Sequence, residues 1–232
     1  MRETTTRRST APVIGIVGGL AAGKSTVAEM LRRRGAAVVD ADGIGHRQLA
    51  SPVVKARLTE AFGRGILDEG GEVDRPRLAE TVFGDSELTR KLNDIVHPPI
   101  LERIRSRIRQ LRRDDRAPLI ALDAALLVET DLHTELCDAL LFVEAPERLR
   151  RERALTGRRM DGGQFEKRTH AQVPVRQKRR LADFVIRNVG DTGELESQLQ
   201  ALWPDLCAVG SGRRGVSGPP QTGRTPEEAD GG

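Results

Sequence analysis

The sequence is poor in aromatic residues: it has no tyrosine, one tryptophan and five phenylalanines among 232 residues. A hydrophobic core must therefore be built from leucine, isoleucine, valine and alanine. Proteins that bind single-stranded nucleic acid stack bases on aromatic rings, so this composition argues against that class. The net charge of +4 does not reverse the argument, because most basic residues are solvated surface. We expect no nucleic-acid partner.

Cysteine pairs and long apolar runs are also missing. Cys137 and Cys207 lie far apart and form no C-x-x-C motif, which favours two reduced thiols over a metal site or a disulfide. No apolar run approaches the roughly 20 residues of a membrane helix. The first residues, MRETTTRRSTAP, lack the apolar segment of a secretory signal. We therefore expect a cytoplasmic protein without a membrane partner, and the sequence leaves its oligomeric state open.

Short apolar runs alternate with helical patterns along most of the chain. Continuous apolar strands separated by helices are typical of a parallel sheet that is covered on both faces. The sequence thus predicts an α/β fold with three layers and about five parallel strands. The expected strands are residues 13–17, 36–39, 118–122, 140–143 and 184–186.

Two stretches depart from simple strand–helix alternation. Residues 45–115 have an almost entirely helical pattern and are too long for one crossover, so we expect a helical insert beside the sheet. Residues 146–180 form a second helical stretch crowded with arginine. The terminal segments are rich in charged residues, glycine and proline and offer little to bury. The predicted organisation is a tail at 1–11, a core at 12–44 and 116–207, the insert at 45–115, and a tail at 208–232.

Residues Gly18–Ser25 fit the phosphate-loop pattern G-x-x-x-x-G-K-[S/T]. A buried-type strand precedes the pattern and a helix is expected from about Lys24 to Arg34. Glycines let the backbone wrap around phosphate with its N–H groups pointing inward, and the helix N-terminus favours an anion. Lys24 would reach the β- and γ-phosphates and the Ser25 hydroxyl would bind Mg²⁺. A glycine turn with an incidental Lys-Ser is the alternative, and it does not explain the flanking elements. ATP and Mg²⁺ are the expected cofactors.

Asp40 and Asp42 follow the second expected strand. Ligands of open parallel sheets bind at the carboxyl ends of the strands, so these carboxylates should face the phosphate loop. On an extended strand end the two side chains would point the same way. One could accept the proton of an attacking hydroxyl while the other holds Mg²⁺. The alternative is a helix cap at Asp42 beside a solvated Asp40.

Six segments together resemble the dephospho-CoA kinase family, and the likeness extends to about residue 202. Their order along the chain is far more specific than the phosphate loop alone. The segments are Ile14–Leu49, Arg57–Phe83, Leu92–Ile100, Leu122–Glu129, Val143–Arg153 and Arg168–Asn188.

The resemblance implies transfer of the γ-phosphoryl of ATP to the 3′-hydroxyl of dephospho-CoA. It makes Asp42 the general base, with Asp40 as its acidic neighbour and a metal ligand together with Ser25. It makes the insert a substrate (CoA) domain, in which Arg75 and His97 would contact the substrate. By itself, a histidine before proline at a helix start is as often a packing or capping residue, and a helix-start arginine is usually solvated. The ATP-binding residues implied are Gly19, Leu20, Ala21, Ala22, Gly23, Lys24, Ser25, Thr26 and Asn188.

The resemblance also makes residues 150–180 a lid over the phosphates. Arginines of a lid can neutralise the charge of the transition state. We expect Arg153 and Arg158 to act catalytically with Lys24, and Lys178 to bind substrate. Two departures from the family pattern bear on this: Gly157 replaces an arginine, which leaves the catalytic lid arginine uncertain in position, and Ala125 replaces a proline.

Two other functions compete with this interpretation. A kinase of another small molecule, such as a nucleoside or shikimate, would need an insert of different character from residues 62–98. A non-catalytic nucleotide sensor or nucleic-acid-binding protein could use the basic lid as a phosphate-binding patch. The set Lys24, Ser25, Asp40 and Asp42 is what a catalyst requires, and it favours the kinase.

Overall fold

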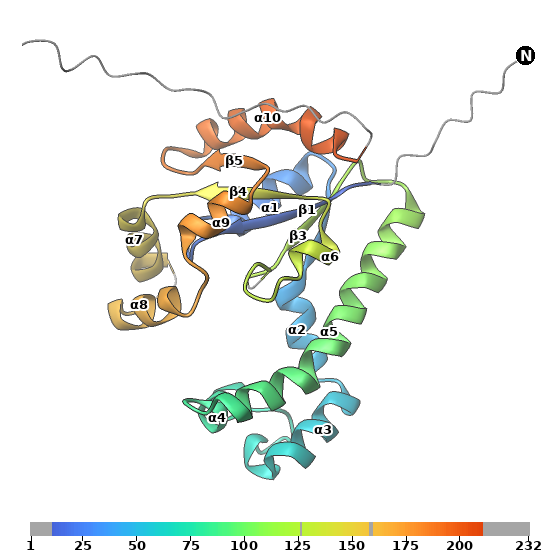
Figure 1. The fold of residues 1–232 in the computed structure, drawn as a ribbon, viewed down its shortest axis with the longest axis vertical. Helices are drawn as coiled ribbons and strands as arrows, with labels where there is room; N and C mark the ends of the chain where they lie inside the picture. Colours follow the sequence, from blue (N-terminus) through green and yellow to red (C-terminus); the bar gives the residue numbers. More distant parts are fainter. Residues whose placement is uncertain (1–10, 126, 158–159, 211–232) are drawn as a thin grey trace, which may run out of the picture.

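A five-stranded parallel sheet forms the centre of the molecule (Figure 1). The computed structural model describes residues 11–125, 127–157 and 160–210. The strand order is β2-β3-β1-β4-β5, so β1 lies in the middle. This confirms the predicted fold class. The strands are β1 Val13–Gly18, β2 Ala37–Asp40, β3 Ile120–Asp123, β4 Ala139–Glu144 and β5 Phe184–Arg187.

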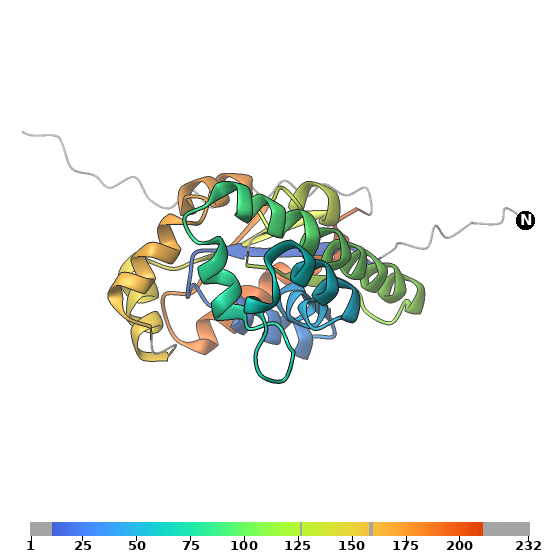
Figure 2. The ribbon, with the colours of Figure 1, turned by 90° about the horizontal axis from the view of Figure 1, so that it is seen from below.

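Helices cover both faces of the sheet, as Figure 2 shows. On one face, α1 (Lys24–Arg33) and α10 (Thr192–Ala208) pack on a core that includes Ile14, Ile16 and Leu31. On the other face, the second half of α5 (Ser86–Asp114) contributes Ile104 and Ile108 to a second core. The short helix α6 (His133–Leu136) and α9 (Val175–Leu181) complete that layer. Because helices cover both faces, the strands are apolar up to their last residues, and such unbroken apolar runs are recognisable in the sequence.

The helical insert leaves the sheet at the end of β2 and returns along α5. Figure 1 shows it extending away from the core, with α5 running back from it to the sheet. The insert has its own small core, which includes Val54, Leu58 and Leu78. Side-chain caps begin its helices: Ser51 for α3 and Asp74 for α4. Its elements are α2 Ala41–Leu49, α3 Pro52–Phe62, η1 Arg64–Ile66, α4 Arg75–Val82 and the first half of α5.

The lid consists of α7 (Glu147–Gly157), α8 (Gly162–His170) and the chain that leads into α9. It is attached to the phosphate loop by a small apolar cluster: Leu20 and Ala21 pack with Ala154, Met160 and Phe165. The lid therefore rests directly on the loop that is expected to bind phosphate.

Several expected boundaries differ from the structure. Ala11, expected in the N-terminal tail, is buried, and α10 extends to Ala208, expected in the C-terminal tail. His97 does not precede a helix, because α5 continues through Pro98 and Pro99. A proline lacks the N–H that the helix would use, so sequence reasoning ends a helix there. In this chain the packing of α5 against α2 and α3 maintains the helix.

Candidate active site

The phosphate loop connects β1 to α1. Gly23 caps α1 with a left-handed backbone (φ 98°), a conformation that glycine adopts without strain. The N–H of Ala22 donates to the carbonyl of Gly19 at 3.1 Å, which closes the turn. The Nζ of Lys24 lies 3.4 Å from the same Gly19 carbonyl and donates to it. The predicted cradle thus has the strand–turn–helix context that phosphate binding requires.

Three carboxylates lie beside this loop at the ends of β2 and β3. Asp40 and Asp123 are paired in register on the neighbouring parallel strands. Asp42 lies in the first turn of α2, and its Oδ1 accepts from the N–H of Ala125 at 3.3 Å. Asp40 and Asp42 were predicted from sequence to face the loop, and the sequence left Asp123 open between a role toward Mg²⁺ through water and a cap or hydrogen-bond partner of the next loop. Its position after an apolar strand, as for Asp40, is the signal that identifies it.

The local backbone at Asp40 corrects the expectation of an extended strand end. Asp40 is the N-cap of α2, and its Oδ1 accepts from the N–H of Gly43 at 2.8 Å. Asp42 is therefore helical, and the two side chains do not extend from one strand. The cap is Asp40, not Asp42, because α2 begins immediately at Ala41. One oxygen of Asp40 is thus used by the helix.

The carboxyl of Asp123 has a raised pKa. Burial raises the pKa of its carboxyl, and the nearby carboxylates of Asp42 and Asp40 raise it further, while Lys24 and a hydrogen bond with Ser25 act in the opposite direction. Ser25 and Lys24 are consequently within interaction range of the same carboxylate. The charges of the phosphate loop and of the strand-end carboxylates therefore interact directly.

A cavity of about 310 Å³ lies over these groups. Its lining combines the phosphate loop, the three carboxylates and Gln172 from the chain between α8 and α9. The lining residues are Leu20, Ala21, Ala22, Gly23, Lys24, Ser25, Ala28, Arg32, Val38, Asp40, Asp42, Asp123, Ala125 and Gln172.

The donor atoms suit Mg²⁺. Among the described residues there is no group of three or more His, Cys, Asp or Glu side chains arranged to hold a metal. Mg²⁺ in kinases is usually held by one or two carboxylates together with substrate phosphates and water, not by an all-protein cage. Ser25 and the partly desolvated Asp123 are hydrogen-bonded to each other, so a hydroxyl and a carboxylate oxygen of this kind lie side by side. The residues present therefore fit the ion.

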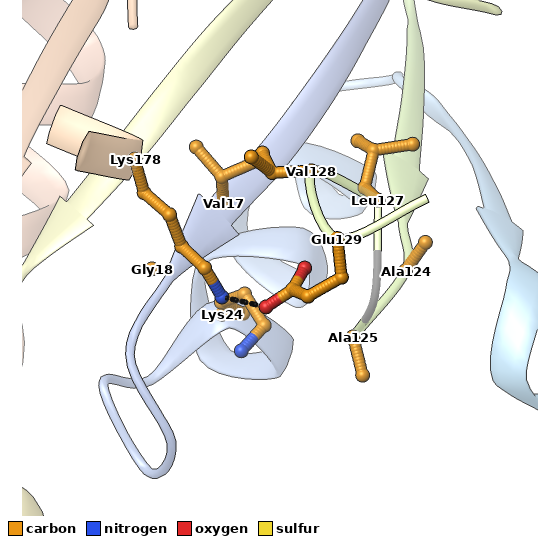
Figure 3. A pocket seen from close by; sticks show the side chains of 9 residues that line it. All are labelled: Val17, Gly18, Lys24, Ala124, Ala125, Leu127, Val128, Glu129 and Lys178. Carbon is orange, nitrogen blue, oxygen red and sulfur yellow. Dashed lines mark ion pairs between the residues drawn. The ribbon is translucent and has the colours of Figure 1, made fainter. Parts of the chain in front are cut away.

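Lys178, which was expected to bind substrate, is buried next to the phosphate loop. It is 2% exposed and forms a buried ion pair with Glu129, beside Lys24 and Gly18 (Figure 3). Its Nζ also lies 3.5 Å from Oε1 of Gln172. Glu129 was not predicted from sequence, because a lone glutamate after an apolar run carries no distinctive pattern. Lys178 thereby contacts the chain that carries Gln172.

Asn188 and Arg153 contact each other next to the phosphate loop. The side-chain amide of Asn188 donates to the carbonyl of Ala22 at 2.8 Å and lies against Gly23. Arg153 donates to the main-chain oxygen of Asn188 at 3.2 Å and approaches its side-chain oxygen at 3.4 Å. Both predicted residues are thus brought together next to the cradle.

The two residues predicted in the insert are not brought to the cavity by the described structure. Arg75 begins α4 and is exposed, and His97 is half-buried in α5; neither is among the described residues that line the cavity. Arg158 lies outside the described residues. Thr26 follows Ser25 in α1 and is exposed.

A central parallel sheet, a phosphate loop after its first strand, and carboxylates at the neighbouring strand ends define a P-loop kinase. The family model for dephospho-CoA kinase matches residues 12–194. The chain is 39% identical to the dephospho-CoA kinase of Aquifex aeolicus over 83% of this chain and 96% of that one. It is 38% identical to the dephospho-CoA kinase of Bacillus licheniformis over 82% and 94% of the two chains. This chain belongs to the dephospho-CoA kinase family, whose members are ATP-dependent phosphotransferases.

Solved structures agree with the fold. The protein TT1252 from Thermus thermophilus superposes with a TM-score of 0.75 at 32% identity, covering 85% of this chain and 99% of that chain. The dephospho-CoA kinase from Campylobacter jejuni has the same fold, with a TM-score of 0.59 at 20% identity and coverages of 85% and 98%. In the described part of the chain no helix is both long and apolar enough to span a bilayer.

Proposed function

We propose that this protein transfers the γ-phosphoryl of ATP to the 3′-hydroxyl of dephospho-CoA, giving coenzyme A and ADP. The observation that carries the proposal is the convergence of Lys24 and Ser25 with Asp42 on one cavity. A kinase requires phosphate-binding groups and an acceptor-activating group within reach of one reacting phosphoryl.

The phosphate loop would bind the nucleotide by its main-chain N–H groups and by Lys24, which reaches the β- and γ-phosphates. Ser25, with Asp40 and Asp123 close by, would hold Mg²⁺. When bound, this ion neutralises charge on the β- and γ-phosphates. Asn188, which lies against Ala22 and Gly23, and Arg153, which donates to Asn188, would contact ATP from this side of the loop.

Asp42 would accept the proton of the 3′-hydroxyl. Its carboxylate is exposed and lines the cavity, so an incoming hydroxyl can reach it. One of its oxygens accepts from the N–H of Ala125, and this contact fixes the orientation of the carboxylate. A positioned base typically contributes about 10²–10⁴ in rate.

The insert and the lid would supply the remaining contacts. We propose that Arg75 and His97 bind dephospho-CoA from the insert, and that Arg158 acts from the lid. Lys178 would act indirectly, by holding Gln172 at the cavity through its buried pair with Glu129. We also propose a cytoplasmic location, which the two free thiols of Cys137 and Cys207 support.

The substitution Asp42→Asn tests the assignment of the base. Turnover should fall by about 10²–10⁴, while affinity for an ATP analogue stays within about threefold, because the base acts on the acceptor and not on nucleotide binding. Steady-state kinetics and calorimetric titration measure the two quantities. Asp205→Asn, an exposed position on α10, is the matched control and should behave as wild type. Near-normal turnover of Asp42→Asn would remove Asp42 from the mechanism.

A further inference from the structure

Arg150 of α7 is a buried arginine with one guanidinium nitrogen unused. Arg150 is 3% exposed. Its Nε donates to the carbonyl of Ala145 at 3.2 Å, and its Nη2 lies 3.8 Å from the largely exposed carboxylate of Glu147. Its Nη1 has no hydrogen-bond partner. Of the two charged residues that are buried in the described chain, Lys178 has a close carboxylate and Arg150 does not.

The unused nitrogen points at the phosphate loop. A Cβ atom at position 19 would overlap Nη1 of Arg150. Position 19 must therefore be glycine to leave room for the guanidinium. Its backbone does not require it, since Gly19 is not among the described residues with positive φ. The Nζ of Lys24 donates to the carbonyl of the same Gly19 at 3.4 Å. Two cationic side chains therefore approach one residue of the cradle from different elements.

This arrangement is unfavourable without an anion. Burial lowers the pKa of the Arg150 guanidinium, with Glu147 acting in the opposite direction, yet arginine remains charged in proteins. A buried donor that lacks a partner carries its full desolvation cost, and a buried charge is favourable only when it is well paired. A ligand anion at this end of the loop would remove both penalties.

We propose that Arg150 makes the nucleotide site selective for the terminal phosphate, by presenting a fixed positive charge to the loop at Gly19. The inference rests on the proposed function of this site as an ATP site. Lys24 of a phosphate loop serves the β- and γ-phosphates, and Lys24 contacts Gly19 here, so this is the γ-phosphate end. Arg150 is thereby a specificity-determining residue, and its effect should appear with ATP more than with ADP.

The test is the binding of two nucleotides to Arg150→Met, a substitution of similar length without the charge. Calorimetric titration with Mg²⁺ compares a non-hydrolysable ATP analogue with ADP. Affinity for the triphosphate analogue should fall by about tenfold or more, the usual scale of a hydrogen bond to a charged group. Affinity for ADP should fall by less than about threefold. Arg150→Lys should recover part of the triphosphate affinity, and the exposed Arg148→Met on the same helix should bind both ligands as wild type does.

Equal losses for the two nucleotides, or no loss for either, would overturn the inference, because a merely structural role does not distinguish them. Wild-type protein that binds neither nucleotide would instead refute the ATP site itself. A second perturbation covers the case in which Arg150→Met fails to fold. Gly19→Ala should displace Nη1 and give the same selective loss, and Arg150→Lys should partly keep the preference for triphosphate. If Arg150→Met folds, the two losses should not add in the double variant; additive losses would contradict an action at Gly19.

Discussion

At the scale of single residues, the site places negative charges close together before any ligand arrives. Burial raises the pKa of the Asp123 carboxyl, and repulsion from Asp42 and Asp40 raises it further. Natural active sites accept such a cost because the same charges later bind a cation or a proton. The position of Asp42 was predictable from the spacing after the second strand, whereas the capping role of Asp40 was not. This capping role depends on the start of α2 at Ala41, and the sequence Asp-Gly-Ile-Gly does not indicate a helix.

The raised pKa of Asp123 predicts a stability effect. The folded protein holds the proton of this group more tightly than the unfolded chain, so its charged form opposes folding at neutral pH. In buffer without Mg²⁺ or nucleotide, Asp123→Asn should melt at a higher temperature than wild type at pH 7.5. The difference should shrink as the pH falls toward the ordinary range of an aspartate, where wild-type Asp123 is protonated. Calorimetry across pH checks this, with Asp205→Asn as control; a destabilised Asp123→Asn at pH 7.5 would contradict the prediction.

At the scale of elements, the lid is held by few contacts. Phe165 of α8 and Ala154 of α7 pack on Leu20 and Ala21 of the phosphate loop, and Arg151 pairs with Glu166 between the two lid helices at 2.8 Å. An exposed ion pair contributes about 0–1 kcal/mol, so we expect the apolar cluster to contribute more than this pair to holding α8 in place. A displacement of these lid helices would therefore disturb the packing of Leu20 and Ala21 in the loop.

Phe165→Ala should therefore release the lid. Removal of a buried phenylalanine costs about 3–5 kcal/mol where the site cannot collapse. We expect faster proteolysis between residues 146 and 180, weaker nucleotide binding and a reduced kcat. Limited proteolysis with kinetics measures all three. Leu155→Ala, at a partly exposed position of α7 (39%), should change each only slightly; equal behaviour of the two variants would argue against the cluster.

The strands and the phosphate loop were predictable because each buried strand is an unbroken apolar run. The helical character of the insert was predictable too, but His97 and the two prolines after it were read as a helix start. Tertiary packing overrides that local signal within α5. Contacts such as Lys178 with Glu129, or Arg150 with Gly19, join residues that are far apart in the chain. A periodic pattern carries no information about such pairs.

At the scale of the molecule, the insert and the lid project from the same end of the sheet (Figure 1). They also touch: the ammonium of Lys167 on α8 lies 3.8 Å from the ring centre of Phe83, which follows α4. A cation–π contact at an exposed site contributes about 0.5–1 kcal/mol, so it can form and break during a catalytic cycle. The site at the strand ends is thus flanked by two appendages, one expected to hold the acceptor and one the phosphates.

The most direct test of the proposed activity is ADP formation with dephospho-CoA compared with a panel of nucleosides, pantetheine and shikimate. A coupled assay with ATP and Mg²⁺ measures it for wild type and for Asp42→Asn. Dephospho-CoA should stimulate ADP formation by wild type well above every other acceptor, and this stimulation should be lost in the variant. If dephospho-CoA does not exceed the panel, the proposed substrate is wrong, even where nucleotide binding is intact.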